Sequence, residues 1–316
     1  MRILFAGTPE IGVPSLGALA DSFEVCGVLT NPDRVQGRKK KLLFSPIKEK
    51  ALELNIPVFQ PEKLDLEFIN TVKELKPDLL VCIAFGKIFR DNFLSIFPEG
   101  GINLHPSLLP IYRGASPLNA VILNGEKTTG ISIQRLAKKM DSGNILFQNS
   151  FNLEGTETTG SLIGKVAKMG APLIVEVVKG IEKGDINEYS QDHTKATFCS
   201  LIKKEDGIIN WNKPSLDILN AVRGYNPWPL AQTKFGDKSL NILEANGSYN
   251  DELEANYITN GVKAGTVISY SKQRGYVVKT QDGIIYVTKL QLQSKKILDY
   301  KSFNNGVQDF VGTQLG

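Results

Sequence analysis

The sequence has few of the side chains that metal centres require. Its 316 residues include only two histidines, three cysteines and two tryptophans. The cysteines Cys26, Cys82 and Cys199 form no CxxC pair, and neither they nor the histidines group at the spacing of metal ligands. Cys26 and Cys82 lie inside apolar runs, where a buried, unreactive thiol is expected. The sequence therefore predicts no metal, and its cysteine usage fits a reducing compartment.

Long apolar runs and a strong charge of one sign are missing as well. The first apolar run, residues 3–6, is too short for a signal-peptide core, and no uncharged apolar stretch reaches the roughly 20 residues of a membrane span. A net charge of +4 is too small to indicate nucleic-acid binding by itself. We expect a cytoplasmic protein of two domains, and because nothing indicates an obligate interface, a monomer.

The glycine fingerprint of dinucleotide-binding proteins is also absent. Gly7 and Gly12 follow the first apolar run, but they lack the GxGxxG spacing that gives the tight turn and the close approach to a pyrophosphate. A nicotinamide cofactor is therefore not expected. The segment instead predicts an ordinary strand-to-helix turn near a ligand cleft.

Short apolar runs alternate with helix start signals through the first half of the chain. Thr8-Pro9-Glu10 and Ser45-Pro46 each place a capping residue before a proline. This alternation predicts an α/β fold, a Rossmann-like and mainly parallel sheet covered by helices. The expected strands are residues 3–6, 23–29, 57–59, 79–85, 101–105 and 130–136.

The pattern changes after about residue 188. Residues 189–208 are polar and weakly periodic, which predicts a linker. A helix at 214–223 and short strands with tight turns then indicate a small OB-like β-barrel at 209–316, with Asp282-Gly283 as a hairpin signal. The expected strands are residues 231–235, 239–244, 265–270, 275–280 and 283–292.

Asn103 and His105 are the residues best suited to chemistry. They are two positions apart in an expected strand, so their side chains share one face. Pro106 restrains His105 to an extended conformation. At the carboxyl end of a central strand, where open α/β sheets bind ligands, the pair would form part of a site. A lone histidine is more often structural, but this one stands beside an asparagine next to apolar residues, which favours a functional role.

A carboxylate follows the next expected strand. Gly143 permits a tight turn that would aim Asp141 back into the same cleft. An aspartate near a histidine raises the pKa of the imidazole and orients it, and an asparagine amide can donate to a developing oxyanion. An Asp-x-Gly sequence after a strand is usually only a turn. Together, however, Asn103, His105 and Asp141 predict an acyl-type transfer without a metal.

Five basic residues crowd a glycine-containing loop after the second expected strand. A charge run is often only a solvated face. As phosphate contacts, these residues would bind a nucleic acid through its backbone charge rather than its base sequence. They are Arg34, Arg38, Lys39, Lys40 and Lys41.

These motifs together resemble the signature of the folate-dependent formyltransferases. The signature is Asn103-Leu-His105-Pro-Ser107-Leu-Leu-Pro110 with Arg113-Gly114 and Asp141-Ser-Gly143 behind it. The resemblance spans nearly the whole chain, and the basic loop and the Asn226-Pro-Trp-Pro229 motif are most similar to the branch that formylates initiator tRNA. Further matches are Ala6-Gly-Thr-Pro9, Asn31-Pro-Asp-Arg34, Pro57-Val-Phe-Gln-Pro61 and Ile209-Asn-Trp211.

The resemblance implies transfer of the formyl group of 10-formyltetrahydrofolate to the α-amine of methionine on initiator methionyl-tRNA, in support of translation initiation. It implies that Asn103 and His105 hold the formyl oxygen, while Asp141 supports a charged His105 and helps to order a water that relays protons. Residues 1–188 would be the catalytic domain, and the basic loop and residues 209–316 would bind the tRNA. The implied folate-binding residues are Phe85, Gly86, Lys87, Ile88, Ser107, Leu108, Leu109 and Pro110.

Other functions remain open at this point. A formyltransferase for a small amine, such as a sugar nucleotide or glycinamide ribonucleotide, would share the three predicted catalytic residues. So would a hydrolase that releases formate from the same folate. A noncatalytic RNA-binding protein is the alternative from a different class, and the intact set of Asn, His and Asp argues against it.

Overall fold

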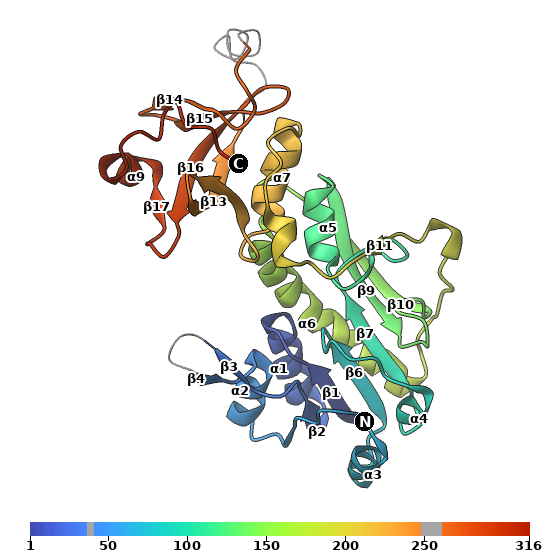
Figure 1. Ribbon diagram of the computed structural model, residues 1–316. Helices are drawn as coiled ribbons and strands as arrows, with labels where there is room; N and C mark the ends of the chain where they lie inside the picture. Colours follow the sequence, from blue (N-terminus) through green and yellow to red (C-terminus); the bar gives the residue numbers. More distant parts are fainter. Residues whose placement is uncertain (37–40, 248–260) are drawn as a thin grey trace. The chain divides into compact units, whose positions relative to one another are not determined.

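The computed structural model of the protein describes residues 1–36, 41–247 and 261–316 (Figure 1). The chain forms two compact units. The N-terminal unit comprises residues 1–117, 128–152 and 162–200, and the C-terminal unit comprises residues 118–127, 153–161 and 201–316. Among the described helices, none combines the length and the apolar character that a membrane crossing needs.

A seven-stranded sheet forms the centre of the N-terminal unit, in the order β10-β9-β7-β6-β1-β2-β5. The strands from β5 to β7 run parallel, which confirms the predicted mainly parallel α/β sheet. β9 runs antiparallel to β7, and β10, which the sequence analysis missed, runs antiparallel to β9. The bounds are β1 (Arg2–Gly7), β2 (Glu24–Leu29), β5 (Val58–Phe59), β6 (Leu79–Ile83), β7 (Gly101–His105), β9 (Thr128–Arg135) and β10 (Ile145–Asn152).

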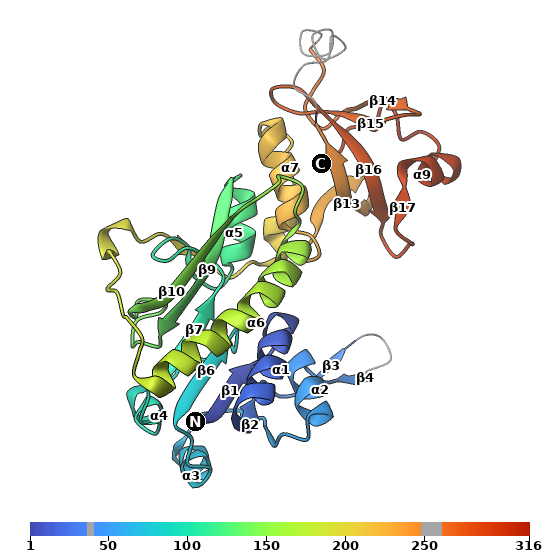
Figure 2. The ribbon, with the colours of Figure 1, turned by 180° about the vertical axis from the view of Figure 1, so that it is seen from behind.

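Helices cover this sheet on both faces. On one face α1 (Val13–Ser22) and the long α6 (Thr159–Lys183) cross the strands, as Figure 2 shows. On the other face, α3 (Leu66–Glu74) and α4 (Asp91–Leu94) pack over an apolar cluster from β1 and β6. Cys82 belongs to that cluster, which confirms the predicted burial of its thiol, and burial raises the pKa of the thiol to about 12.

The two helix start signals behave differently. Ser45 caps α2 (Pro46–Glu53) as predicted, because its side chain accepts a hydrogen bond from the Lys48 amide at 3.1 Å. Thr8 does not cap a helix. Its Oγ1 instead accepts from Asn31 Nδ2 at 3.0 Å, and only the short 3-10 turn η1 (Glu10–Gly12) precedes α1.

The C-terminal unit is built on an antiparallel sheet, in the order β12-β13-β16-β15-β14 with β17 beside β16. This confirms the predicted small β domain after the α/β domain. Tyr276, Phe303 and Phe310 fill its core with edge-on rings, the closest pair of centroids being 4.7 Å apart. The elements are α5 (Pro117–Leu123), η3 (Lys204–Gly207), α7 (Ser215–Gly224), β12 (Ala231–Phe235), β13 (Lys238–Asn246), β14 (Val267–Ser271), β15 (Gly275–Lys279), β16 (Ile284–Leu292), β17 (Leu298–Asp299) and α9 (Tyr300–Gly306).

Candidate active site

Asn103 and His105 lie on the same face of β7, as their spacing predicted. In the antiparallel register with β9, Asn103 is opposite Gln134 and His105 is opposite Ser132, so four polar side chains share this face. Leu104 points the other way, toward α6 at Gly170. His105 is only 4% exposed, whereas Asn103 is partly exposed. The sequence thus places a buried imidazole beside an accessible amide.

Asp141 reaches this face by a different route from the one expected. Because β9 is antiparallel to β7, its end lies at the opposite end of the sheet from the carboxyl end of β7. The turn that follows β9 therefore brings Asp141 back over the face of the sheet rather than to its carboxyl edge. Asp141 itself has the left-handed conformation of this turn, with φ 51°. Gly143 is needed for another reason, because a Cβ there would lie 2.0 Å from the Arg135 carbonyl oxygen.

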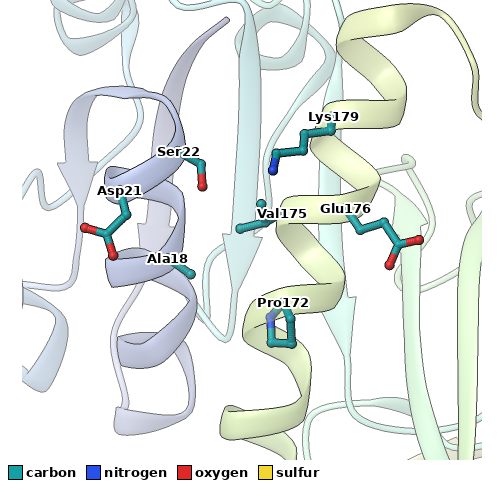
Figure 3. A pocket seen from close by; sticks show the side chains of 7 residues that line it. All are labelled: Ala18, Asp21, Ser22, Pro172, Val175, Glu176 and Lys179. Atoms are coloured by element: carbon teal, nitrogen blue, oxygen red, sulfur yellow. The ribbon is translucent and has the colours of Figure 1, made fainter.

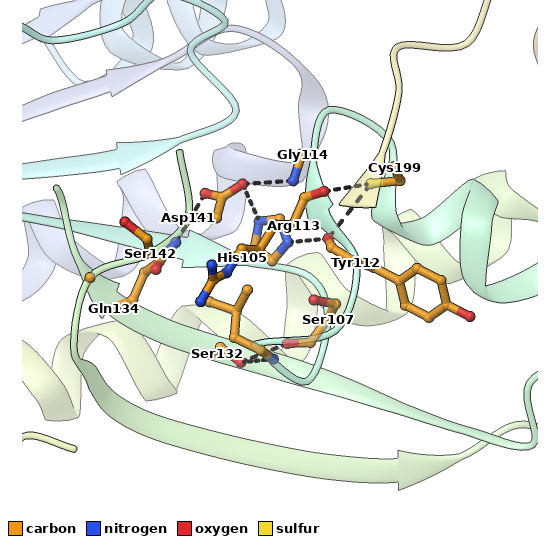
Figure 4. A network of polar contacts seen from close by, with 12 residues as sticks. His105, Ser107, Tyr112, Arg113, Gly114, Ser132, Gln134, Asp141, Ser142 and Cys199 are labelled. Atoms are coloured by element: carbon orange, nitrogen blue, oxygen red, sulfur yellow. Dashed lines mark hydrogen bonds and ion pairs between the residues drawn. The ribbon is translucent and has the colours of Figure 1, made fainter. Parts of the chain in front are cut away.

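The His105 ring is held between a backbone carbonyl and a carboxylate (Figure 4). Its Nε2 lies 2.8 Å from the Tyr112 carbonyl oxygen, which can only accept, so Nε2 carries the proton. Its Nδ1 lies 3.7 Å from Asp141 Oδ2, too far for a direct hydrogen bond. Burial lowers the pKa of His105, and Asp141 and the Tyr112 carbonyl only partly oppose this effect. The resting ring is therefore neutral, with a bare Nδ1 facing the carboxylate.

The Asp141 carboxylate is fixed by two donors on different oxygens. The Gly114 backbone N–H donates to Oδ2 at 2.8 Å, and Gln134 Nε2 donates to Oδ1 at 3.0 Å. Gly114 belongs to β8 (Arg113–Gly114), which pairs with β11 (Phe198–Cys199). A Cβ on Gly114 would lie 2.1 Å from the Cys199 carbonyl oxygen, and its φ is 121°, so glycine is required there. These two donors fix the position and the orientation of the carboxylate.

A further ring of polar residues surrounds these contacts, and the sequence analysis did not single out its glutamines. Gln191 comes from the segment predicted as a linker, yet it is only 5% exposed. Its Nε2 donates to Gln134 Oε1 at 3.1 Å, and its Oε1 accepts from buried Arg113. The Arg113 guanidinium also donates to Nδ1 of His193 at 2.8 Å. His193 and Cys199, which had no expected role, thus lie at the border of the site.

The Asn103 amide is free to meet a ligand. Among the described residues it has no hydrogen-bond partner, and it lies next to the His105–Asp141 pair on the sheet face. An amide N–H without a partner in the protein can donate to an oxyanion that forms beside it. The arrangement supports an acyl-type transfer. Within the described ranges no cluster of histidine, cysteine, aspartate and glutamate could hold a metal ion.

The predicted folate-binding residues fall into buried and accessible groups. Phe85 is buried and stacks on Phe89 with ring centroids 5.4 Å apart, while Gly86 and Ile88 are exposed. Lys87 Nζ donates to the Pro61 carbonyl at 2.7 Å. In the second segment, the side chains of Ser107 and Leu109 are buried, and Leu108 and Pro110 are partly exposed.

The predicted basic loop lies largely outside the described residues. Arg38, Lys39 and Lys40 are in the undescribed segment 37–40. Arg34 and Lys41 belong to the strands on either side of it, β3 (Arg34–Gln36) and β4 (Lys41–Leu43), which pair as an antiparallel hairpin. The residues on either side of this segment, which were expected to belong to a loop, thus form a two-stranded hairpin.

Both ends of this hairpin are tied to the sheet. Before it, Asp33 accepts from Lys48 Nζ at 2.5 Å and from Gln60 Nε2 at 2.8 Å. After it, the Ser45 hydroxyl bonds to the Thr30 hydroxyl at 2.8 Å. These contacts fix the direction in which the hairpin leaves the sheet.

A surface hollow lies on the face of the sheet opposite the site, between α1 and α6 (Figure 3). None of the predicted site residues contributes to it. Its side chains belong to the outer surfaces of two helices and offer no grouping of nucleophile and base. The lining residues are Ala18, Asp21, Ser22, Pro172, Val175, Glu176 and Lys179.

The mainly parallel sheet, the Asn103, His105 and Asp141 grouping, and the small antiparallel unit define a class of one-carbon transferase. Residues 1–178 match the family model described as Formyl transferase, and residues 201–308 match the one described as Formyl transferase, C-terminal domain. The chain belongs to the formyl transferase family. The resemblance seen in the sequence is confirmed.

Similar proteins narrow the class further. The methionyl-tRNA formyltransferase of Treponema denticola is 44% identical to this chain over 98% of both sequences. That of Borrelia recurrentis is 40% identical over 99% of both. A solved N-formyltransferase from Helicobacter canadensis, in complex with folinic acid and dTDP-3-aminofucose, has a TM-score of 0.65 at 20% identity, covering 91% of this chain and 98% of that one. This last similarity shows the shared fold.

Proposed function

We propose that this chain transfers the formyl group of 10-formyltetrahydrofolate to the α-amine of methionine on initiator methionyl-tRNA, in support of translation initiation. The observation that carries the proposal is the buried His105–Asp141 pair beside the open Asn103 amide. It stands in a chain that is 44% identical, over nearly its whole length, to a methionyl-tRNA formyltransferase.

The reaction requires a hydrogen-bond donor to an oxyanion and a route for the transfer of one proton. The amine nitrogen bonds to the formyl carbon, and the bond from that carbon to the folate nitrogen breaks. Attack turns the formyl oxygen into an oxyanion, to which Asn103 Nδ2 would donate. His105 would first take up a second proton from solvent on Nδ1 and would then donate from Nδ1 to the oxyanion while keeping that proton. The Asp141 carboxylate would stabilise the resulting cation.

Asp141 would also take part in the transfer of a proton from the amine to the folate. The attacking amine loses a proton and the departing folate nitrogen gains one. Asp141, or a water that it orders, would carry this proton between the two nitrogens, because its carboxylate faces the His105 ring at 3.7 Å. General acid–base catalysis of this kind typically contributes about 10²–10⁴-fold to the rate.

The folate would lie against residues 85–88 and 107–110. Apolar walls with accessible main-chain groups suit a flat pteridine ring, and the exposed backbone at Gly86 is of this kind. Arg34, Arg38, Lys39, Lys40 and Lys41 would contact the acceptor end of the tRNA. In this proposal residues 1–188 form the catalytic domain, residues 189–208 a connection, and residues 209–316 bind the tRNA through its backbone.

A small amine is the alternative acceptor. The Helicobacter canadensis enzyme was solved with an amino-sugar nucleotide, and it shares this fold. The identity to that enzyme is 20%, against 44% to the tRNA-formylating relative, which favours the tRNA as acceptor.

An acceptor comparison tests the proposal. Purified protein is given 10-formyltetrahydrofolate with charged methionyl initiator tRNA, free methionine, an amino-sugar nucleotide or glycinamide ribonucleotide, and formylated product and free formate are both measured. We expect transfer to the charged tRNA alone. Transfer only to a small amine would overturn the acceptor, release of formate without any acceptor would indicate a hydrolase, and tRNA binding without transfer would indicate a noncatalytic protein.

A further inference from the structure

The segment that follows α6 contributes one buried amide to the site. Gln191 is 5% exposed, whereas its neighbours Ser190 and Asp192 are exposed. Its Oε1 accepts from Arg113 Nε at 3.1 Å and from an Arg113 Nη at 2.6 Å. Its Nε2 donates to Gln134 Oε1 at 3.1 Å and to the backbone carbonyls of Asp141 and Gly143 at 3.0 and 2.7 Å. Every polar position of this side chain is thus used.

These contacts form a series of hydrogen bonds that all donate in the same direction, from Arg113 toward Asp141. An arginine can only donate and a carboxylate can only accept, whereas an amide side chain does both. Arg113 donates to Gln191, Gln191 donates to Gln134, and Gln134 donates to Asp141 Oδ1. Because the two ends allow only one direction, neither amide can turn over without placing two donors or two acceptors against each other.

We propose that Gln191 is a positioning residue that fixes the Asp141 carboxylate for proton transfer. It acts in two ways: its donation to Gln134 keeps Nε2 of Gln134 aimed at Oδ1, and its bonds to the Asp141 and Gly143 carbonyls hold the turn itself. The inference rests on the proposed role of Asp141. It assigns a task in the reaction to the segment that sequence reasoning treats as a connection.

Among the described residues, few other titratable groups lie close enough to affect this arrangement. His105 faces Asp141 from β7, and the thiols of Cys82 on β6 and Cys199 on β11 lie within electrostatic range of it. Burial raises the pKa of both thiols, so they are neutral near pH 7. Arg113 and His193 contact the far end of this series. A change at Gln191 therefore affects mainly the Asp141 carboxylate and the His105 imidazole.

Gln191→Glu is the first variant that tests the positioning role. A carboxylate at this position keeps the contact with Arg113 but donates to none of the three acceptors. We expect kcat to fall by about 10²-fold, because small misplacement of a reacting group has an effect of that size. We expect KM for both substrates to change little. The unfolding temperature should fall, because buried acceptors lose their donor, so kcat is compared at a temperature at which circular dichroism shows each variant to be folded. Gln191→Met, which removes the amide without adding charge, should lower kcat in the same way.

Glu188→Gln is the matched control. Glu188 ties the same segment to the same strand, accepting from Arg135 Nε at 2.8 Å, but it does not contact the Asp141 carboxylate. It is partly exposed to solvent, and ion pairs of that kind contribute little, so its kcat should match the parent. A parental kcat in both Gln191 variants, or an equal loss in Glu188→Gln, would overturn the inference.

A second readout does not depend on activity. The chain has two histidines, so the ring signals of His105 can be followed by NMR during a pH titration. In Gln191→Met the Gln134 amide is no longer held toward Asp141, so the carboxylate can move closer to Nδ1 and we expect the midpoint of His105 to rise. In Glu188→Gln it should stay unchanged. If the parent transfers no formyl group, the proposed function fails, and this titration still decides whether Gln191 positions Asp141; an unmoved midpoint would refute it.

Discussion

His105 Nδ1 and Asp141 Oδ2 face each other across 3.7 Å, with the ring neutral and the proton on the opposite nitrogen. Distance alone would suggest an ion pair. Burial nevertheless has the larger effect on the pKa of His105 and lowers it. In the proposed reaction the ring would become charged on taking up a proton from solvent, whereas at rest it is neutral.

Replacing Asp141 should lower the pKa of His105 further. Asp141→Asn removes the negative charge that opposes the effect of burial, while the Tyr112 carbonyl still accepts from Nε2. An NMR titration of the two histidines measures this, with His193 as the internal reference. A midpoint at or above that of the parent would contradict the electrostatic account of the pair.

The buried ring should also make the stability of the protein depend on pH. Burial lowers the folded-state pKa of His105 below the ordinary 6.5 of an imidazole, so the unfolded chain takes up a proton first as the pH falls. The contribution of the neutral His105 ring to the free energy of unfolding is complete above pH 6.5 and is lost as the pH falls below that value. Between the two pKa values the loss is at most about 1.4 kcal/mol per pH unit. Unfolding by urea at several pH values should show a weaker loss at acid pH in His105→Gln, and equal slopes would contradict this.

Asn103→Ala should lower kcat by about 10²–10³-fold, the usual effect of losing one oxyanion donor. The unfolding temperature should hardly change, because the Asn103 amide has no partner among the described residues. Kinetic assays and thermal unfolding of the same preparation provide the measurement. Asn70→Ala, on the exposed surface of α3, is the control and should leave both unchanged. A kcat within a few-fold of the parent would remove Asn103 from the mechanism.

Gly143→Ala should damage the site and the fold together. The new methyl group would meet the Arg135 carbonyl at 2.0 Å, and overpacking of this kind typically costs about 1–3 kcal/mol. Gly164→Ala is a control in which we expect the stability of the protein to rise instead of fall. Gly164 is exposed within α6 with open space around it, so alanine should stabilise the helix by about 0.5–1 kcal/mol. Denaturant unfolding of the two variants should therefore diverge, and a stable, active Gly143→Ala protein would refute the packing argument.

Alanine at Arg38, Lys39, Lys40 and Lys41 should weaken tRNA binding and flatten its salt dependence. Each lost phosphate contact lowers the slope of log affinity against log salt by about 0.7–0.9. Alanine at Lys168, Lys179 and Lys183 on the exposed side of α6 provides the control and should leave the slope unchanged. If the variant with alanine at these four positions kept the parental salt dependence, the basic residues would not contact the tRNA and would only be solvated.

Much of the site could be predicted from local patterns. Asn103 and His105 share a face because residues two apart in a strand always do, and the strand itself was a clear apolar run. Asp141 could be singled out because it follows a strand and stands two residues before a glycine. What the sequence could not show was the direction of β9, since the alternation of residues 130–136 is the same for parallel and antiparallel pairing. The route by which Asp141 returns depends on that direction.

The glutamines of the site were missed for a different reason. Gln134 alternates with Ile133 in the strand and would ordinarily face water, yet it is 1% exposed, because the segment that contains Gln191 covers it. Gln191 lies in a polar, weakly periodic stretch with no local sign of burial. Its position is set by Arg113, which is 78 residues away in the sequence, and such contacts leave no periodic signal. One signal was present: Ser132 and Gln134 repeat the spacing of Asn103 and His105.

The turn from β9 back to Asp141 has a consequence for how the sequence can vary over evolutionary time. Residues 137–140 are all exposed, and their side chains are not needed to place the carboxylate. Their number matters, because the turn must span the distance from the end of β9 to the point above Gln134 where Asp141 is held. Relatives that keep the reaction should therefore exchange these four amino acids freely and conserve the length of the segment, so that insertions and deletions are rarer here than substitutions.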